Sequence, residues 1–248
     1  MPPIDWILLT AVSFIAALVQ AATGFGFAIV AVPFYLIILE SLSAVQVSLI
    51  VTLSITILVA IRVWRSAPPA LLGRLVAGTL AGFPFGIVAY RHADLETAKL
   101  AVGLLIVGFA VWLFLAARGR PAVENPATHP AADIAVGIVS GAMTTSLGMP
   151  GPVVLIYLSV LGTGKEAMRA TMLTLFVFSN AGAIALQEWQ VGIDGATWQT
   201  AAFLIPAVLI GGAVGHGVSR FLDQRTFSFV VLAILAATGL YMTWTTLA

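Results

Sequence analysis

The chain has 248 residues, of which 60% are hydrophobic and 8% are charged, whereas an ordinary soluble domain has roughly 25% charged residues. This composition indicates a polytopic all-α membrane protein, because the apolar stretches are too long for barrel strands and a bilayer requires every backbone polar group to be bonded internally. The net charge of +1 provides no basic surface for nucleic acid, and the lack of cysteine excludes disulfides and cysteine-ligated metals. No cofactor is expected.

Apolar runs between charged and turn-forming residues predict the membrane segments. The first half contains Ile4–Leu39, Ser43–Ile61, Ala70–Ala89 and Thr97–Ala117. The second half contains Ala132–Leu161, Ala167–Leu186, Trp198–Val218 and Phe227–Leu247. Residues 118–131 contain three prolines and are expected to form a cytoplasmic linker. The predicted domains are a first membrane repeat over residues 1–117 and a second over residues 132–248, with the N-terminal run belonging to the mature fold.

The two halves resemble each other in sequence. A shift of 122 residues places Tyr35 on Tyr157 and Thr52 on Thr174. A shift of 129 residues places Gly82, Gly86, Arg91, Asp94 and Thr97 on Gly211, Gly215, Arg220, Asp223 and Thr226. These matches predict an internal duplication, and the glycine pairs are expected to permit close packing between helices.

The first segment of each half is too long for one span. As a single helix, Ile4–Leu39 would be about 54 Å long, well beyond a hydrocarbon core of about 30 Å. Glycine and proline predict helix breaks at Thr23–Phe27 and at Ser146–Pro152. Each half is therefore expected to be a broken or re-entrant helical hairpin followed by three transmembrane helices.

The eleven Lys and Arg residues distinguish two topologies. If each broken segment crosses the membrane once, the two sides carry five and six of these residues; if it enters and returns, they carry nine and two. The second distribution agrees with the positive-inside rule, so the re-entrant arrangement is preferred. Such a unit has an odd number of spans, so the second copy is expected to be inverted, with both termini in the periplasm. An eight-helix bundle in which every segment spans is the alternative.

The two breaks carry the candidate substrate site. A helix that starts at a break presents free amide groups that favour anions, and nearby glycines let a ligand reach the backbone. Buried hydroxyl and amide side chains add donors. The expected substrate-binding residues are Gln20, Thr23, Gly24, Phe25, Gly26, Phe27, Gln46, Thr145, Ser146, Gly148, Met149, Pro150, Gly151 and Asn180. The alternative interpretation is that the breaks shape packing and the amides join helices.

Ionisable groups are scarce inside the predicted spans. His216 is the only one deep in a span and is a candidate for proton coupling, whereas Gln187 is expected at the membrane interface. No acidic residue lies in the middle of a span, so a neutral site suited to an anion is predicted. Neither an HExxH pattern nor paired carboxylates occur within the spans, so no catalytic residue, metal site or enzyme activity is expected.

Two motifs resemble a known family. Ala22–Ala28 reads Ala-Thr-Gly-Phe-Gly-Phe-Ala and is followed by Pro33, and Gly148–Pro152 reads Gly-Met-Pro-Gly-Pro. Their sequences, their positions at the start of both halves and the two-half organisation resemble the TauE/SafE sulfite exporter family over nearly the whole chain. This resemblance implies export of sulfite or of a small organosulfur anion such as sulfoacetate. The first motif is less glycine-rich than the family leads us to expect, and its bulkier lining favours a substrate with an apolar portion.

These observations together predict a secondary transporter of the bacterial inner membrane. It is expected to export a small anion by alternating access, with the anion held at the hairpin tips near the membrane midplane. An anion channel and a non-transporting scaffold subunit are the alternatives. The expected partners are the anionic substrate and the lipid bilayer, not nucleic acid, and the sequence leaves open whether the chain forms a homo-oligomer.

Overall fold

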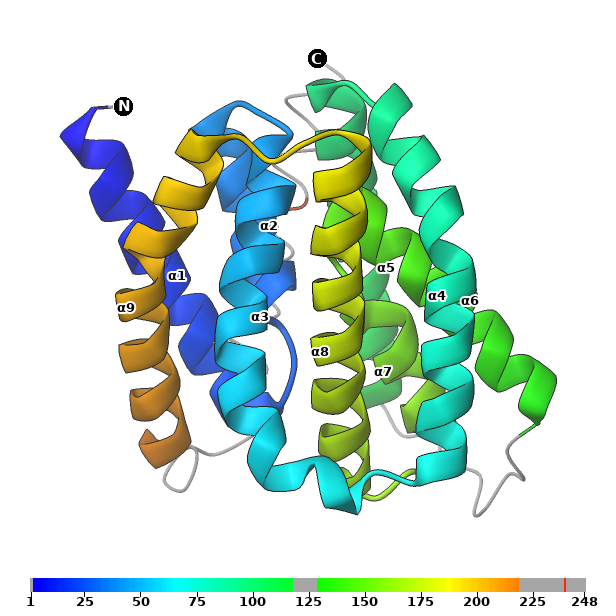
Figure 1. Cartoon of the computed structure of the whole chain (residues 1–248). Helices are drawn as coiled ribbons and strands as arrows, with labels where there is room; N and C mark the ends of the chain where they lie inside the picture. Colours follow the sequence, from blue (N-terminus) through cyan, green and yellow to red (C-terminus); the bar gives the residue numbers. More distant parts are fainter. Residues whose placement is uncertain (1, 118–128, 219–238, 240–248) are drawn as a thin grey trace.

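The structure is a computed structural model that describes residues 2–117, 129–218 and 239 (Figure 1). Within these ranges the chain is helical and contains no strand. Six helices there are long and apolar enough to cross a membrane, which confirms the expected polytopic class. The elements are α1 (Pro3–Thr23), α2 (Phe27–Leu39), α3 (Ser43–Val63), the 3-10 turn η1 (Trp64–Ser66), α4 (Pro69–His92), α5 (Leu95–Ala117), α6 (Pro130–Leu147), α7 (Gly151–Val160), α8 (Lys165–Gln190) and α9 (Gly195–Val218). The predicted segment Phe227–Leu247 lies outside the described residues.

Both predicted helix breaks are confirmed. The first separates α1 from α2 and the second separates α6 from α7. Gly24, Gly26 and Gly148 have φ of 89°, 104° and 69°, a left-handed conformation that favours glycine and ends a helix. The helices after the breaks, α2 and α7, have 13 and 10 residues, too few to cross a hydrocarbon core of about 30 Å. Figure 1 shows the chain running down through α1 and back up through α2.

The main helix pairs join the two predicted halves. Helix α4 packs on α6, α9 packs on α1, and α3 packs on α8. Glycines allow the first two pairs to approach closely, as expected: a Cβ added to Gly82 would lie 2.0 Å from the Ile138 carbonyl oxygen, and one added to Gly211 would lie 2.4 Å from that of Phe14. These two glycines occupy the positions that the 129-residue shift matches.

A matched pair of glycine variants tests this packing. Gly82→Ala should lower the free energy of unfolding by about 1–3 kcal/mol, because the new methyl group overlaps the backbone of α6. Gly73→Ala, also on α4, adds a methyl group with no atom within 4 Å and should be neutral or slightly stabilising. Thermal unfolding of both purified variants measures the difference. Equal stabilities would mean that the α4–α6 contact is looser than the structure has it.

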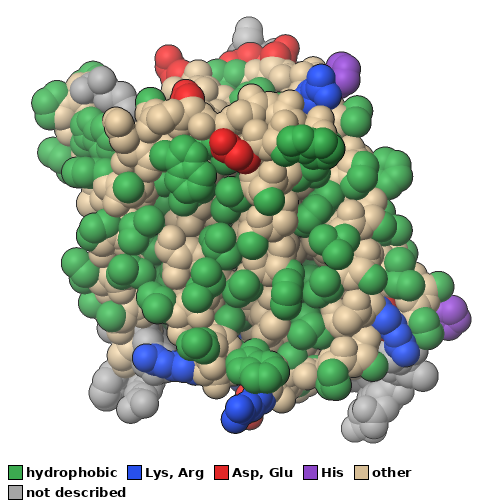
Figure 2. Space-filling model, in the orientation of Figure 1, with side chains coloured by type: hydrophobic (Ala, Val, Ile, Leu, Met, Phe, Trp, Pro, Cys, Tyr) green, Lys and Arg blue, Asp and Glu red, His purple; other side chains and the backbone are tan. Residues whose placement is uncertain are grey.

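Charged residues gather at the two ends of the bundle (Figure 2). Five of the seven Lys and Arg residues in the described part of the chain lie at one end, called the basic end here: Arg62, Arg65, Arg74, Lys165 and Arg169. The start of α8 is fixed there because it packs on η1, where the Ser66 hydroxyl donates to Glu166 at 2.9 Å. The opposite, acidic end carries Arg91 and Lys99 together with Asp5, Glu40, Asp94, Glu96, Glu188 and Asp194.

Two carboxylates at the acidic end accept from backbone amides just inside the following helices. Asp94 accepts from the Thr97 amide at 2.7 Å, before α5, and Asp194 accepts from the Thr197 amide at 2.6 Å, before α9. Hydrogen bonds from the side chain and backbone of these threonines lower the pKa of both carboxyls below its ordinary value. Both carboxylates therefore stay ionised at neutral pH at the positive ends of the helix dipoles.

A buried carboxylate joins three helices at the basic end. Asp133, in the first turn of α6, is fully buried, and its Oδ2 pairs with Arg74 Nη1 of α4 at 3.1 Å. Its other oxygen accepts from the Tyr157 hydroxyl of α7 at 2.5 Å. In the first half, the matching Tyr35 hydroxyl of α2 hydrogen-bonds to Ser13 of α1 at 2.6 Å. Each hairpin is thus held by one tyrosine, and in the described part of the chain the second hairpin is also tied to α4 by an ion pair.

Candidate functional site

The first hairpin tip, Thr23–Gly26, is built by local hydrogen bonds. The Thr23 hydroxyl donates to the Phe25 carbonyl at 2.6 Å and accepts from the Phe25 amide at 3.3 Å. Phe27 begins α2 and is buried. Arg169 of α8 lies against this tip: its Nη2 donates to the Ala21 carbonyl at 2.9 Å. A Cβ on Gly24 would lie 2.6 Å from Arg169 Cγ, so this glycine makes room for the arginine.

The second hairpin tip is Leu147–Pro150. The two hydroxyls just before it, which were expected to contact substrate, donate hydrogen bonds to backbone carbonyls of α6 instead. Thr145 Oγ1 donates to the Gly141 carbonyl at 3.0 Å, and Ser146 Oγ donates to the Ala142 carbonyl at 2.7 Å. The tip is closed by fully buried Met149 and by Ser140, whose hydroxyl donates to the Pro150 carbonyl at 3.0 Å.

Helix α8 forms one wall of the second tip. Phe176, Asn180 and Gln187 are spaced by four and seven residues, so they lie on one face of α8. The ring of Phe176 lies 3.3 Å from where a Cβ of Gly151 would be, and Gln187 Nε2 donates to the Thr145 carbonyl at 2.8 Å. Gln187 is fully buried, and its side chain turns toward α6. It lies three residues before the end of α8, and its place at the membrane interface stays a prediction.

Asn180 lies between these two contacts. It is fully buried, and neither its Nδ2 nor its Oδ1 is hydrogen-bonded to another group in the described part of the chain. Burying an unpaired amide costs about 1–3 kcal/mol, so such a group calls for a specific reason.

Helix α3 forms the facing wall. Val45 is the nearest neighbour of Gly148, 3.4 Å from where a Cβ on that glycine would lie, and Ser48 and Thr52 follow one and two turns along the same face. Both hydroxyls are buried without a partner. On α8, the hydroxyls of Thr174 and Ser179 are also buried and unpaired. Helices α3 and α8 therefore each carry buried hydroxyls that have no hydrogen-bond partner in the described part of the chain.

Other predicted site residues have structural partners. Gln20 Nε2 donates to Thr56 Oγ1 at 2.8 Å, and Gln46 Nε2 donates to the Gly192 carbonyl at 3.1 Å. The first bond joins α1 to α3, as the alternative interpretation of the amides had it, and the second joins α3 to the turn between α8 and α9. The side chain of His216 lies outside the described residues, although its backbone belongs to α9.

The two tips contact different parts of α8. Arg169, near the start of α8, contacts the first tip, whereas Phe176 lies against Gly151 after the second tip and Gln187 bonds to Thr145 before it. Arg169 precedes Phe176 by seven residues and Gln187 by eighteen. One site shared by both tips stays a prediction. Asn180 and the α3 hydroxyls accompany the second tip, and Arg169 accompanies the first.

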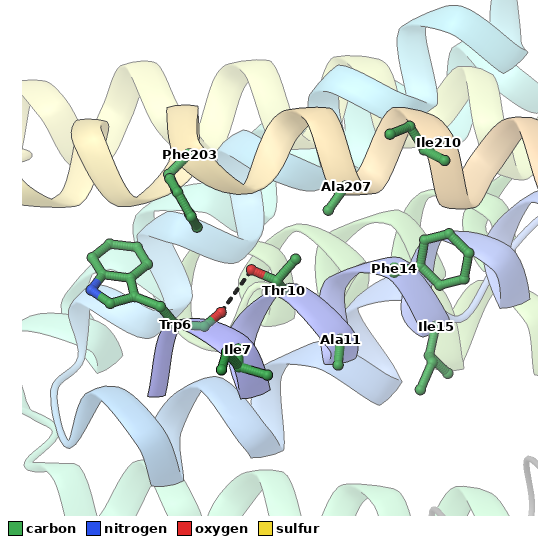
Figure 3. Close-up of a pocket in the computed structure, with 9 residues that line it drawn as sticks. All are labelled: Trp6, Ile7, Thr10, Ala11, Phe14, Ile15, Phe203, Ala207 and Ile210. Carbon is green, nitrogen blue, oxygen red and sulfur yellow. Dashed lines mark hydrogen bonds between the residues drawn. The ribbon is translucent and has the colours of Figure 1, made fainter. Parts of the chain in front are cut away.

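A groove of about 620 Å³ between α1 and α9 differs from the surroundings of the two tips, because its lining is mostly apolar (Figure 3). Its walls are apolar, and the hydroxyl of its one threonine, Thr10, donates to the Trp6 carbonyl at 2.7 Å. Ile7 and Phe203 there are 64% and 55% exposed, so the groove lies on the outer surface. Eight of the nine residues that line it have apolar side chains, so the groove fits an apolar environment better than an anion. Within the described residues, no group of three or more possible metal ligands occurs either.

Sequence reasoning missed Arg169 and the unpaired hydroxyls of α3 and α8. In the sequence, Arg169 stands out only as a topological charge at a segment end. A signal for two of the hydroxyls is present, since Thr52 and Thr174 occupy matching positions in the two halves. No pattern distinguishes Ser48 or Ser179 from other hydroxyls in apolar runs.

A comparison with protein-family models finds a match that covers most of the chain. The family model described as "Sulfite exporter TauE/SafE" matches residues 9–242 of the 248. The chain belongs to this family. The match confirms the resemblance seen in the two motifs, and with the six apolar helices it makes the protein a multi-pass membrane transporter. None of the curated proteins or solved structures compared with the chain matches it.

Proposed function

We propose that this TauE/SafE protein is a secondary transporter that exports a small sulfur-containing anion, such as sulfite or sulfoacetate. The observation that carries this proposal is the buried, unpaired amide of Asn180 beside the second helix break. In a family of anion exporters, a neutral polar cluster with unused hydrogen-bonding capacity is the expected chemistry of a substrate site.

The proposed site combines three sources of donors. Asn180 Nδ2 comes from α8, the hydroxyls of Ser48 and Thr52 come from α3, and the N-terminus of α7 adds backbone amides from Gly151 onward. A sulfonate or sulfite group presents several acceptor oxygens that such donors can bind. Phe176 supplies an apolar wall near Gly151, which suits the carbon portion of an organic anion. This site differs from the one expected from the sequence, because it uses one tip and two facing helices.

The membrane orientation follows from the charge distribution. With Lys165 and Arg169 at the same end as Arg62, the basic end faces the cytoplasm of a bacterial inner membrane by the positive-inside rule. The N-terminus, at the acidic end of α1, then lies in the periplasm. The short helices α2 and α7 are the returning arms of re-entrant hairpins. Pairing of α4 with α6 and of α9 with α1 is what two inverted repeats related by a pseudo-two-fold axis produce, and it supports alternating access between the halves.

Binding measurements on detergent-purified protein test the proposal. Titration with sulfite, sulfate, sulfoacetate, taurine and acetate should show saturable stabilisation against heat by sulfite or sulfoacetate. Gly148→Leu should abolish this response, because the left-handed φ of 69° and the contact with Val45 leave no room for the side chain. Gly108→Leu, on α5 with no atom within 4 Å of an added Cβ, is the control and should keep it.

Transport by reconstituted vesicles separates a carrier from the alternatives. A carrier should show flux that saturates with anion concentration, whereas a channel conducts without saturating at ordinary concentrations. If no anion stabilises the protein and no flux occurs, the transporter proposal is wrong and a scaffold role gains support. Binding that survives Gly148→Leu would instead show that the anion binds elsewhere.

A further inference from the structure

Arg169 is a partly buried cation without an acidic partner. Its Nε is buried and bonded to no other group, and no ion pair involving Arg169 occurs within the part of the chain that the structure describes. The other partly exposed cations there, Arg74 and Lys99, each pair with a carboxylate. A charge taken out of water without a partner is unfavourable, so a compensating anion is expected near the guanidinium.

The contact with the first tip explains only part of this placement. One N–H of Arg169 caps the free Ala21 carbonyl near the end of α1, a favourable place for a cation. A guanidinium has five N–H donors in a rigid fork, and the cap leaves Nε unused. Capping alone could be performed by an exposed side chain. The close approach to Gly24 instead places the arginine against the left-handed turn from which α2 starts.

Arg169 also lies on the face of α8 that leads to Asn180. It precedes Phe176 by seven residues, so Arg169, Phe176 and Asn180 share one side of the helix. Asn180 is about 16 Å farther from the basic end, at about 1.5 Å per residue. The two hairpin tips are thus connected by one face of α8, with a cation at its outer end and a neutral amide within.

We propose that Arg169 binds the anionic group of the substrate at the basic end of α8, before the substrate reaches Asn180, and selects net anions over zwitterions. This role rests on the proposed function and deepens it. Arginine suits it because its planar fork matches the oxygens of a sulfonate or carboxylate. The neutral cluster around Asn180 then needs no charge of its own to discriminate between anions and zwitterions. The first tip, beside Arg169, and the second tip, whose wall includes Asn180, thereby serve one substrate in sequence.

Transport kinetics of charge variants test this role. Purified wild type, Arg169→Gln, Arg169→Lys and the control Arg65→Gln are reconstituted into sealed vesicles, and uptake of sulfoacetate is compared with uptake of taurine, a zwitterion with the same sulfonate. Arg65 is a suitable control because it is exposed at the same end and lies over the Trp64 ring at 5.4 Å. Substrate is added to the face that carries the basic end, identified by protease access to the linker.

Arg169→Gln should raise KM for sulfoacetate about tenfold or more, change Vmax less, and reduce the preference for sulfoacetate over taurine. Arg169→Lys should recover part of the preference, and Arg65→Gln should behave like wild type. A purely structural cap would lower the amount of folded protein without changing selectivity. Unchanged KM and selectivity in Arg169→Gln, or equal changes in the Arg65→Gln control, would overturn the role of Arg169.

A second measurement uses only the wild type, so it tests the role of Arg169 even if Arg169→Gln does not fold. Phenylglyoxal modifies accessible arginines, and peptide mass spectrometry of the wild type reports its rate at Arg169 and at Arg65. Sulfoacetate should slow the reaction at Arg169 alone; equal rates with and without sulfoacetate would overturn the role. If the wild type transports none of the anions, the proposed function itself fails and this role fails with it. Wild-type transport without an effect at Arg169 removes only the present inference.

Discussion

Asn180→Leu should increase the thermal stability of the purified protein and, at the same time, abolish anion binding and transport. The wild-type amide is fully buried with both polar atoms unpaired. Leucine has the same branched shape as asparagine, with methyl groups in place of the two polar atoms, so the substitution should stabilise the fold by about 1–3 kcal/mol. Removing the donor from the proposed site should weaken binding of sulfite or sulfoacetate by about tenfold or more. Opposite changes in stability and function are typical of a residue kept for activity.

Thr171→Val provides the matched control on the same helix. Thr171 is also fully buried, but its hydroxyl donates to the Ala167 carbonyl at 2.7 Å within α8. This substitution should leave binding and transport unchanged. Thermal unfolding without anion, followed by titration with sulfite and sulfoacetate, measures both quantities for each variant. If Asn180→Leu destabilises the protein and retains normal transport, Asn180 is a structural residue and the proposed site is wrong.

The fold class and the helix breaks could be predicted because they depend on local chemistry. A chain with only 8% charged residues has too few of them for an ordinary soluble domain, so its composition predicts that it spans a membrane. Gly24, Gly26 and Gly148 adopt left-handed conformations that other residues avoid, so glycine-rich interruptions in an overlong apolar run mark the ends of helices. The close approach of Gly82 to α6 was predictable from its spacing for the same reason: only a missing side chain permits it.

Which residues form the candidate site depends on hydrogen bonds within the protein, and a sequence does not show these bonds. Most hydroxyls in apolar helices donate to the carbonyl four residues earlier, as Thr56 does to Thr52 at 2.6 Å. Ser48 and Thr174 do not, and this difference is set by tertiary packing. Asn180 was predicted and is unpaired, whereas Gln20 was predicted by the same reasoning and bonds to Thr56. An amide side chain within a span therefore predicts burial. Whether it serves packing or is a candidate for substrate binding depends on whether it has a hydrogen-bond partner in the protein.

The surroundings of the two tips could not be derived from their similar sequences. Arg169 near the start of α8 contacts the first tip, whereas Val45 near the start of α3 lies closest to Gly148 of the second. Tertiary packing decides which side chain of a neighbouring helix meets each tip, and a glycine-rich motif carries no information about that choice.

Arg74→Leu should lower the free energy of unfolding by roughly 2–4 kcal/mol, because it leaves the carboxylate of Asp133 buried without its cation. The Asp133 side chain is fully buried, whereas that of Arg74 is 34% exposed, so the expected loss is smaller than for a fully buried pair. Tyr157 still donates to Asp133, but a neutral hydroxyl compensates the charge only in part. Unfolding of the purified variant by heat or denaturant measures the loss.

The double variant Arg74→Leu/Asp133→Leu should recover at least half of that loss, since replacing both partners of a buried ion pair by apolar groups removes the unpaired charge. The remaining deficit would come from the Tyr157 hydroxyl, which then has no carboxylate to bond. A triple variant that adds Tyr157→Phe should recover part of this deficit as well. If the double variant is as unstable as Arg74→Leu alone, the loss of stability comes from the missing packing of the arginine stem on α6. The unpaired charge of Asp133 is then not its cause.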